Sequence, residues 1–183
     1  MPKYIAFLRA INVGGHTVKM DHLRSLFAAL GFANVETFIA SGNVIFDSTS
    51  KSTKALEKKI EGYLEKTLGY PVATFIRSTA ELARISEHKP FADSDLNIAG
   101  HTLYIGFMAE TPSDSAKARL LSLATKIDDF NVDGHELYWL CRAKKFSESE
   151  FSGALLAKTL GLPTTLRNAT TVKKLAAKYP HHK

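Results

Sequence analysis

The order of strand-like and helix-like patterns along the chain limits its fold more than any other feature. In the first half, Met20, Leu23 and Phe27 recur at helical spacing, and Ser52 and Gly69 are typical of the start and end of a second helix. The patterns predict strand, helix, strand, strand, helix, strand and a short helix over residues 3–10, 19–30, 35–40, 43–47, 52–69, 72–77 and 80–87.

The second half of the chain repeats this order without repeating its residues. Asp133-Gly134, between two apolar runs, is the strongest hairpin signal in the sequence, and Pro112 fits the first turn of a helix. The predicted elements cover residues 101–109, 112–126, 130–132, 136–142, 148–160 and 164–167, followed by a last helix that ends near Tyr179.

Two successive units of this kind predict an α+β protein made of two tandem ferredoxin-like (βαββαβ plus helix) subdomains packed together. The expected boundaries are 1–88 for the first subdomain, 89–100 for a linker rich in Pro, Gly and Asp, and 101–183 for the second. Such a unit covers one sheet face with its own helices, yet the strands here are apolar on both faces. The second face therefore needs cover from the other subdomain, a second chain or a ligand.

The composition places the chain among ordinary globular proteins. Its 183 residues are 45% hydrophobic and 23% charged, which argues against disordered and collagen-like chains. No apolar stretch approaches the ~20 residues of a membrane-spanning helix. Residues 3–13 lack a signal-peptide cleavage site, and the single cysteine, Cys141, cannot form an internal disulfide. We therefore expect a cytoplasmic protein without a membrane partner. No histidine pair has metal-ligand spacing, so we expect no metal and no cofactor.

The excess of basic residues lies in the last quarter of the chain. Residues 1–134 contain 15 basic and 15 acidic residues, whereas residues 135–183 contain nine basic and three acidic ones. The net charge of +6 therefore belongs to that last segment. This asymmetry predicts an anionic partner, either nucleic acid or a phosphorylated small molecule; a merely solvated set of lysines is the alternative.

The topology predicts a first anion site in the first subdomain. The loop after the first strand lies at the same sheet edge as the turn between the second and third strands. Paired glycines before a helix leave backbone N–H groups that can face an anion, although a tight turn that needs positive φ is the simpler explanation. The residues expected at this site are Arg9, Asn12, Gly14, Gly15, Lys19, Ser41, Gly42 and Asn43.

A second anion site is predicted in the second subdomain. There the ends of the third and fourth strands should meet at the opposite sheet edge, beside the start of the last helix. Cations gathered at a helix start repel one another unless an anion is present; a solvated basic edge is the alternative. The residues expected at this site are Arg142, Lys144, Lys145, Arg167, Asn168 and Thr171.

Together these features predict a binding protein for an anionic, phosphate-bearing partner, either nucleic acid or a nucleotide. One alternative is an enzyme that acts on a phosphorylated small molecule, with phosphate clamps at Arg9, Asn12, Lys19 and Arg167. Another is a protein-interaction or oligomerisation module that uses the apolar sheet faces. No catalytic motif identifies a reaction, and Ser41 lacks the context of a nucleophile elbow.

Several short segments share their residues with one bacterial family. They are Arg9–Gly15, Val18–Met20 with Leu23-Arg24, Ser41–Phe46, Lys89–Phe91, Lys145–Ser147, Leu166–Asn168 and Thr171–Leu175. These segments resemble the successive blocks of the domain of unknown function 1697 (DUF1697). The resemblance covers nearly the whole chain and implies two ferredoxin-like subdomains, but no activity.

The chain departs from that family at two positions. Ala10 stands where the family usually has Gly, and Ala169 where it usually has Trp after Arg-Asn. The second departure removes any contact that this Trp makes with a ligand in relatives.

Overall fold

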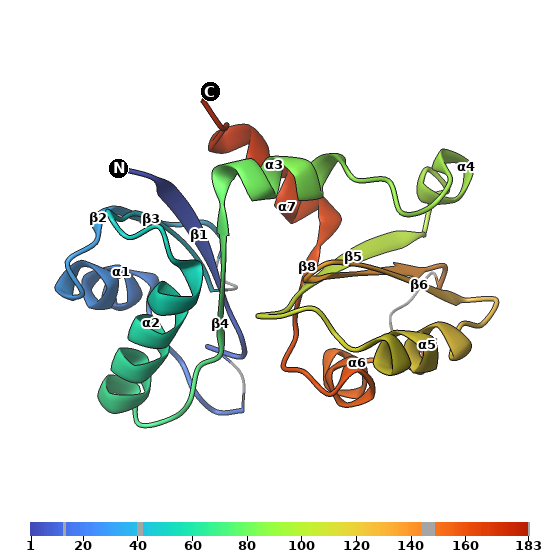
Figure 1. The fold of residues 1–183 in the computed structure, drawn as a ribbon, viewed down its shortest axis with the longest axis horizontal. Helices are drawn as coiled ribbons and strands as arrows, with labels where there is room; N and C mark the ends of the chain where they lie inside the picture. Colours follow the sequence, from blue (N-terminus) through green and yellow to red (C-terminus); the bar gives the residue numbers. More distant parts are fainter. Residues whose placement is uncertain (13, 40–41, 144–148, 183) are drawn as a thin grey trace. The chain divides into compact units, whose positions relative to one another are not determined.

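The structure is a computed structural model, and it describes residues 1–12, 14–39, 42–143 and 149–182. Over these residues the protein is α+β, with two four-stranded antiparallel sheets and seven helices, which confirms the predicted class (Figure 1). The chain divides into two compact units, Met1–Leu82 with Tyr179–Lys183, and Ala83–Lys178. The subdomain boundaries at residues 88 and 101 stay a prediction.

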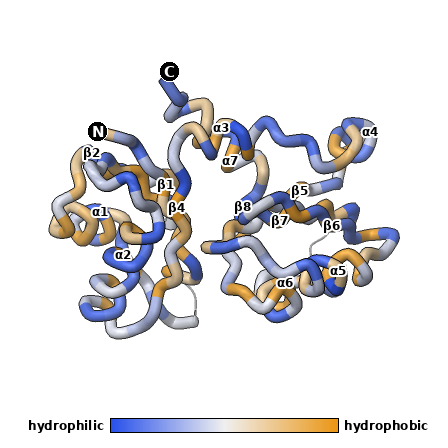
Figure 2. The backbone as a smooth tube through the Cα atoms, viewed as in Figure 1, coloured by the Kyte–Doolittle hydropathy of each residue, from blue (hydrophilic) through white to orange (hydrophobic). Residues whose placement is uncertain are grey.

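The first unit has one sheet covered on one face by two helices. Its elements are β1 (Lys3–Leu8), α1 (Met20–Ala29), β2 (Ala33–Thr37), β3 (Asn43–Asp47), α2 (Thr53–Leu68), β4 (Thr74–Ser78) and the start of α3 (Thr79–Glu87). The strand order is β2-β3-β1-β4, and each neighbouring pair is antiparallel. Phe27 of α1 and Ile60 of α2 share a buried core with Ala6 and Phe46, so both helices lie on the same sheet face (Figure 1). Much of the hydrophobic colour in this unit follows β1 (Figure 2).

The outer edge of β4 is covered by glutamates. Because β4 pairs with β1 on one side only, the N–H groups of alternate residues point away from the sheet. Glu61, Glu57 and Glu81 accept hydrogen bonds from these groups, with distances of 2.9, 2.9 and 2.8 Å. The donors are Thr74, Ile76 and Ser78. The carboxylates therefore satisfy backbone donors that a neighbouring strand would otherwise bind.

The second unit repeats the arrangement with two further helices. Its elements are the end of α3, then α4 (Asp93–Leu96), β5 (Thr102–Phe107), α5 (Asp114–Ser122), β6 (Asp128–Asp133), β7 (Glu136–Cys141), α6 (Gly153–Leu160), β8 (Thr165–Asn168) and α7 (Ala169–Lys178). The strand order is β6-β7-β5-β8, again antiparallel throughout. Leu120 of α5 and Leu156 of α6 pack in one core with Trp139 and Tyr104. Leu103 and Ile105 alternate with Tyr104 along β5, so they lie on the opposite face.

Local signals predicted several element ends correctly. The Ser52 side chain accepts a hydrogen bond from Ala55 N, and Gly69 ends α2 at φ +83°. Asp133 pairs with Glu136 across the β6–β7 hairpin, as the Asp-Gly signal predicted.

Several predicted boundaries differ from the observed ones; for example, α5 ends at Ser122 and α6 begins at Gly153. For two other boundaries the structure shows a local reason. The connection between β2 and β3 is five residues long, not a two-residue hairpin, because Ile39 has a φ of +60° and the Phe38 N–H donates to Asn43 O. The helix expected from Pro112 begins at Asp114, because the Ser113 side chain accepts from Ala116 N and so caps it.

Candidate functional site

A cavity of the second unit lies beside the start of α7, and we call it the α7 cavity. Its volume is about 740 Å³. It is bounded by the end of α3, by α4, by the start of β5 and by the first turn of α7. Its lining residues are Ile85, Ser86, Glu87, His88, Lys89, Asp93, Leu96, Asn97, His101, Thr102, Leu103, Ile105, Asn168, Ala169, Thr170 and Lys173.

The N-terminus of α7 forms one wall of the cavity. The helix follows β8 without a loop, and Asn168 caps it by accepting a hydrogen bond from Thr170 N at 2.9 Å. Lys173 lies one turn after Ala169, on the same helix face. Among the described residues Lys173 has no ion-pair partner. This wall therefore combines the positive end of the α7 dipole with a lysine ammonium, both of which attract anions.

The opposite wall contains charged and aromatic groups from the segment between α3 and β5. Lys89 pairs with Asp93 at 3.1 Å, so their charges largely cancel. The His88 ring lies 4.8 Å from that of Tyr138, and its Nε2 is 4.0 Å from an Asp133 oxygen. These contacts hold His88 at the rim of the cavity.

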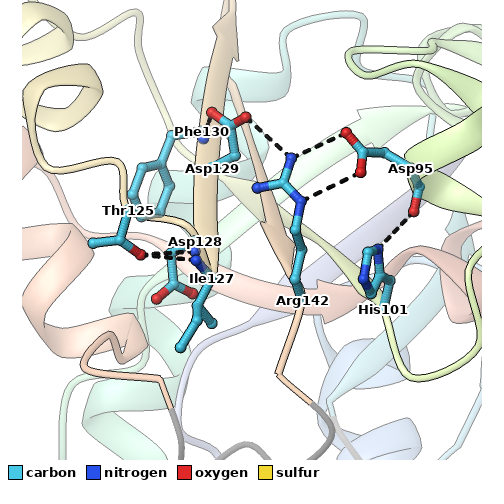
Figure 3. Close-up of polar contacts among 8 residues, drawn as sticks. All are labelled: Asp95, His101, Thr125, Ile127, Asp128, Asp129, Phe130 and Arg142. Carbon is cyan, nitrogen blue, oxygen red and sulfur yellow. Dashed lines mark hydrogen bonds and ion pairs between the residues drawn. The ribbon is translucent and has the colours of Figure 1, made fainter.

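A cluster of ion pairs lies next to the cavity, where α4 meets the ends of two strands (Figure 3). Arg142 donates to both carboxylate oxygens of Asp95, at 3.4 and 3.1 Å, and to Asp129 at 3.4 Å. The hydrogen bond from Arg142 lowers the pKa of Asp95, and the same bond raises the pKa of Arg142. His101 Nδ1 lies 2.8 Å from the Asp95 carbonyl oxygen, which fixes the imidazole beside the cavity.

The structure places one part of the first predicted anion site, Gly42, beside the end of β1. The Leu8 N–H donates to Gly42 O at 2.8 Å, which joins the end of β1 to the β2–β3 connection as predicted. Asn12 Oδ1 accepts from Val18 N, and Asn43 is buried with its amide donating to Phe38 O. The Asn12 and Asn43 side chains thus stabilise the backbone of this region.

The two glycines of that loop adopt the expected conformation. Gly14 and Gly15 have φ values of +68° and +84°, and Lys19 directly precedes α1. Arg9 continues the ladder of β1 by donating its backbone N–H to Ala73 O. Ser41 lies outside the described residues.

The second predicted anion site is arranged differently from the expectation. The ends of β7 and β8 lie at one end of the sheet, but β5 lies between them, so two strand spacings, about 10 Å, separate the strands. Arg142 binds carboxylates on its own side of the sheet. Arg167 is buried, its Nη1 donates to Thr165 Oγ1 and Leu166 O, and burial lowers its pKa to about 10.

Of the members of that predicted set that the structure describes, only Asn168 lines the α7 cavity. Thr171 lies in the same helical turn, and Lys144 and Lys145 lie outside the described residues. The sequence analysis missed His88, Lys89, His101 and Lys173 as lining residues. One signal was present, because Lys89-Pro90-Phe91 matched a family block although the segment was expected to be a linker.

Ala169 also lines the cavity, at the position where the sequence departs from the family pattern. It is 7% exposed, so a small and largely buried side chain stands at this position.

The fold and the site define an α+β protein with two four-stranded antiparallel sheets and a cavity at one helix N-terminus. No helix among the described residues is both long and apolar enough to cross a membrane. Residues 1–138 match the family described as "Protein of unknown function (DUF1697)", and the chain belongs to this family.

A solved structure supports the fold over nearly the whole chain. It is that of the conserved bacterial protein SP0830 from Streptococcus pneumoniae. The two proteins share 23% sequence identity with a TM-score of 0.79, and the match covers 97% of this chain and 98% of the other. A comparison with curated protein sequences gives no match.

Proposed function

We propose that this protein binds a small anionic ligand that carries a phosphate group, such as a nucleotide, in the α7 cavity. The observation that carries the proposal is the wall at the start of α7, where the first turn of the helix and Lys173 line one cavity. Phosphate is the ligand group that a helix N-terminus and a lysine bind together most readily.

The apolar part of the cavity supports a ligand that is larger than phosphate alone. Leu103 and Ile105 of β5 and Ile85 of α3 line it together with the polar residues. A volume of about 740 Å³ falls within the range of typical small-molecule sites. A nucleotide matches this pattern, because its base is largely apolar on both faces and its phosphate is charged.

A small ligand is favoured over a nucleic acid polymer by the contacts of two arginines. Arg142 is paired with Asp95 and Asp129, and Arg167 is buried in the sheet. Neither side chain adds a cation to an exposed basic edge that could bind successive phosphates. Lys173 instead lines a cavity of limited volume, which suits a small ligand.

We propose further that each unit is a ferredoxin-like subdomain, so that the two form a tandem pair. The strand orders β2-β3-β1-β4 and β6-β7-β5-β8, with two helices on one face of each sheet, support this assignment. The sequence has a single cysteine, the buried Cys141, which supports a cytoplasmic location, where thiols stay reduced.

The proposed function is tested by titrating the ¹⁵N-labelled protein with adenosine monophosphate and, separately, with inorganic phosphate. We expect amide shifts at Ala169, Thr170 and Lys173. Lys173→Gln should weaken binding about tenfold, because a hydrogen bond to a charged group contributes about 1.5 kcal/mol. Lys174→Gln is the matched control, since Lys174 is the next residue of α7 and does not line the cavity.

The outcome that would refute this proposal is an absence of shifts at millimolar ligand, or equal binding by the two lysine variants. A labelled single-stranded oligonucleotide is the second probe. Binding to it with a log–log salt slope near −3, as for about four phosphate contacts, would favour a nucleic acid partner instead.

A further inference from the structure

We propose that α4 is a gate of the α7 cavity and that an ionic latch, formed by Asp95, Arg142 and Asp129, keeps this gate closed. The proposal rests on the proposed function, because it describes how a ligand reaches that site. Residues at both ends of α4 line the cavity, namely Asp93 and Leu96. Movement of α4 therefore changes access to the cavity directly.

The helix itself is poorly anchored by packing. It has a single turn, and none of its residues is buried. Its other polar contacts are local: Leu96 N donates to Ala92 O, and Lys89 pairs with Asp93. Segments with few buried contacts open at a lower free energy than the sheet that carries them.

Among the polar contacts of the described residues, those of Asp95 link α4 to the sheet. Its carboxylate binds Arg142, which directly follows β7, and its carbonyl oxygen accepts from His101, which directly precedes β5 (Figure 3). Both links originate from one residue of α4. Loss of the Asp95 carboxylate therefore removes the ionic half of the attachment and leaves the backbone half in place.

Arg142 is well placed to act as the fixed part of the latch. Its backbone N–H donates to Ile127 O at 2.8 Å, and its guanidinium also binds Asp129 of β6. The Arg142 side chain is 21% exposed, whereas that of Asp95 is 38% exposed. The arginine thus stays with the sheet while the aspartate can leave with α4.

The latch is weak enough to open in solution. Ion pairs between partly exposed groups change a population by about fivefold or less, and salt screens them. A ligand can therefore enter through a minor open state, and the latch sets the population of that state.

Access to the cavity is measured without any ligand, from the rate at which a maleimide labels the thiol introduced by Leu103→Cys. Leu103 lines the cavity, and the native Cys141 is buried. Adding Asp95→Asn should raise this labelling rate about fivefold at low salt, and Arg142→Gln should do the same. At about 1 M salt the rates should converge, because the screening length falls to about 3 Å.

The matched control is Asp93→Asn, which removes the same charge from the same helix without breaking a contact to the sheet. It should leave the labelling rate of the Leu103→Cys thiol within about twofold. A thiol introduced by Leu121→Cys, at an exposed position of α5, reports any general loosening and should be unaffected by Asp95→Asn.

Equal labelling in the Asp95→Asn and Asp93→Asn backgrounds would overturn the gate, whatever the protein binds. Additive effects of Asp95→Asn and Arg142→Gln in the double variant would overturn the latch, because coupled residues are non-additive. If labelling responds as expected but adenosine monophosphate does not bind, the gate stands and the proposed nucleotide ligand fails.

Discussion

Glu57 provides a direct test of how the edge of the first sheet is stabilised. Its Oε1 accepts a hydrogen bond of 2.9 Å from the backbone N–H of Ile76, and the residue is only 8% exposed. Glu57→Leu replaces the carboxylate with an apolar side chain of similar size and leaves this buried donor without a partner. Leaving a buried polar group unsatisfied costs about 1–3 kcal/mol, so we expect a loss of that size in the free energy of unfolding.

Glu57→Gln separates the hydrogen bond from the charge. The glutamine amide oxygen can still accept from Ile76, while the charge is gone. Burial raises the pKa of Glu57, and the nearby Glu61 and Glu81 add to this effect, so the ionised carboxylate is disfavoured in the folded state. We therefore expect Glu57→Gln to lie within about 0.5 kcal/mol of the wild type at neutral pH, or to be more stable.

The pH dependence has a definite sign. The folded-state pKa of Glu57 lies above its usual value of 4.5, so the folded state binds this proton more tightly than the unfolded state does. The resulting stabilisation is fully present below about pH 4.5 and is lost as pH rises through the raised pKa. The stability of Glu57→Gln relative to the wild type should therefore increase across that interval.

Urea unfolding followed by circular dichroism measures the free energy of unfolding of the wild type, Glu57→Leu and Glu57→Gln at several pH values between 4 and 7. Glu65→Leu and Glu65→Gln are the controls, because Glu65 is an exposed residue of the same helix. Both should change stability by about 0.5 kcal/mol or less. The reasoning is refuted if Glu57→Leu is as stable as Glu57→Gln, since the hydrogen bond would then contribute nothing.

Three further predictions concern the first unit, each measured by urea unfolding. Gly42→Ala should lower the free energy of unfolding by at least about 2 kcal/mol, because φ is +79° and the new Cβ would lie 2.9 Å from Ile11 Cγ2. The control is Gly62→Ala, in open space inside α2, which should instead raise the free energy of unfolding by up to about 1 kcal/mol. Ala10→Gly should stabilise by up to about 1 kcal/mol, because Ala10 has a φ of +54°; no gain would mean that the strain is relieved elsewhere. Burial opposes the ionisation of Asp47, but hydrogen bonds from Asn34 and Lys3 lower its pKa. The ionised Asp47 therefore stabilises the fold above the usual pKa of 3.8, and this stabilisation is lost as pH falls through the lowered pKa. Asp47→Asn should abolish this part of the acid dependence of stability, and an unchanged pH profile would contradict the assignment.

Local sequence signals determined the elements of this protein where neighbouring residues carry the information. Ser52 and Gly69 delimit α2, and Asp133-Gly134 forms the β6–β7 turn, because caps and tight turns depend on residues a few positions apart. The order of the other elements, without α4, followed from periodicity together with these signals, and with it the α+β class and two four-stranded sheets.

Connections without a local signal could not be predicted in this way. The residue types at 38–42 do not indicate that Ile39 adopts a positive φ. Hydrogen bonding between the β2 and β3 sides of this connection compensates for the strained backbone, and it is not visible in the local sequence. The segment 89–100 has the composition of a linker, yet Asp95 holds its one-turn helix against His101 and Arg142, which flank two strands.

The candidate site belongs to what only the tertiary structure decided. Sequence reasoning placed Arg142 and Arg167 in one anion site because both follow strands of the same unit. The fold places β5 between those strands, where one arginine meets two carboxylates and the other is buried. The α7 cavity joins Lys89, Leu103 and Lys173, which lie as far as 84 positions apart in the sequence. The sequence gives the sign of each charge, but the fold decides which opposite charge lies near it. Electrostatic attraction depends on distance, and only the folded chain defines these distances.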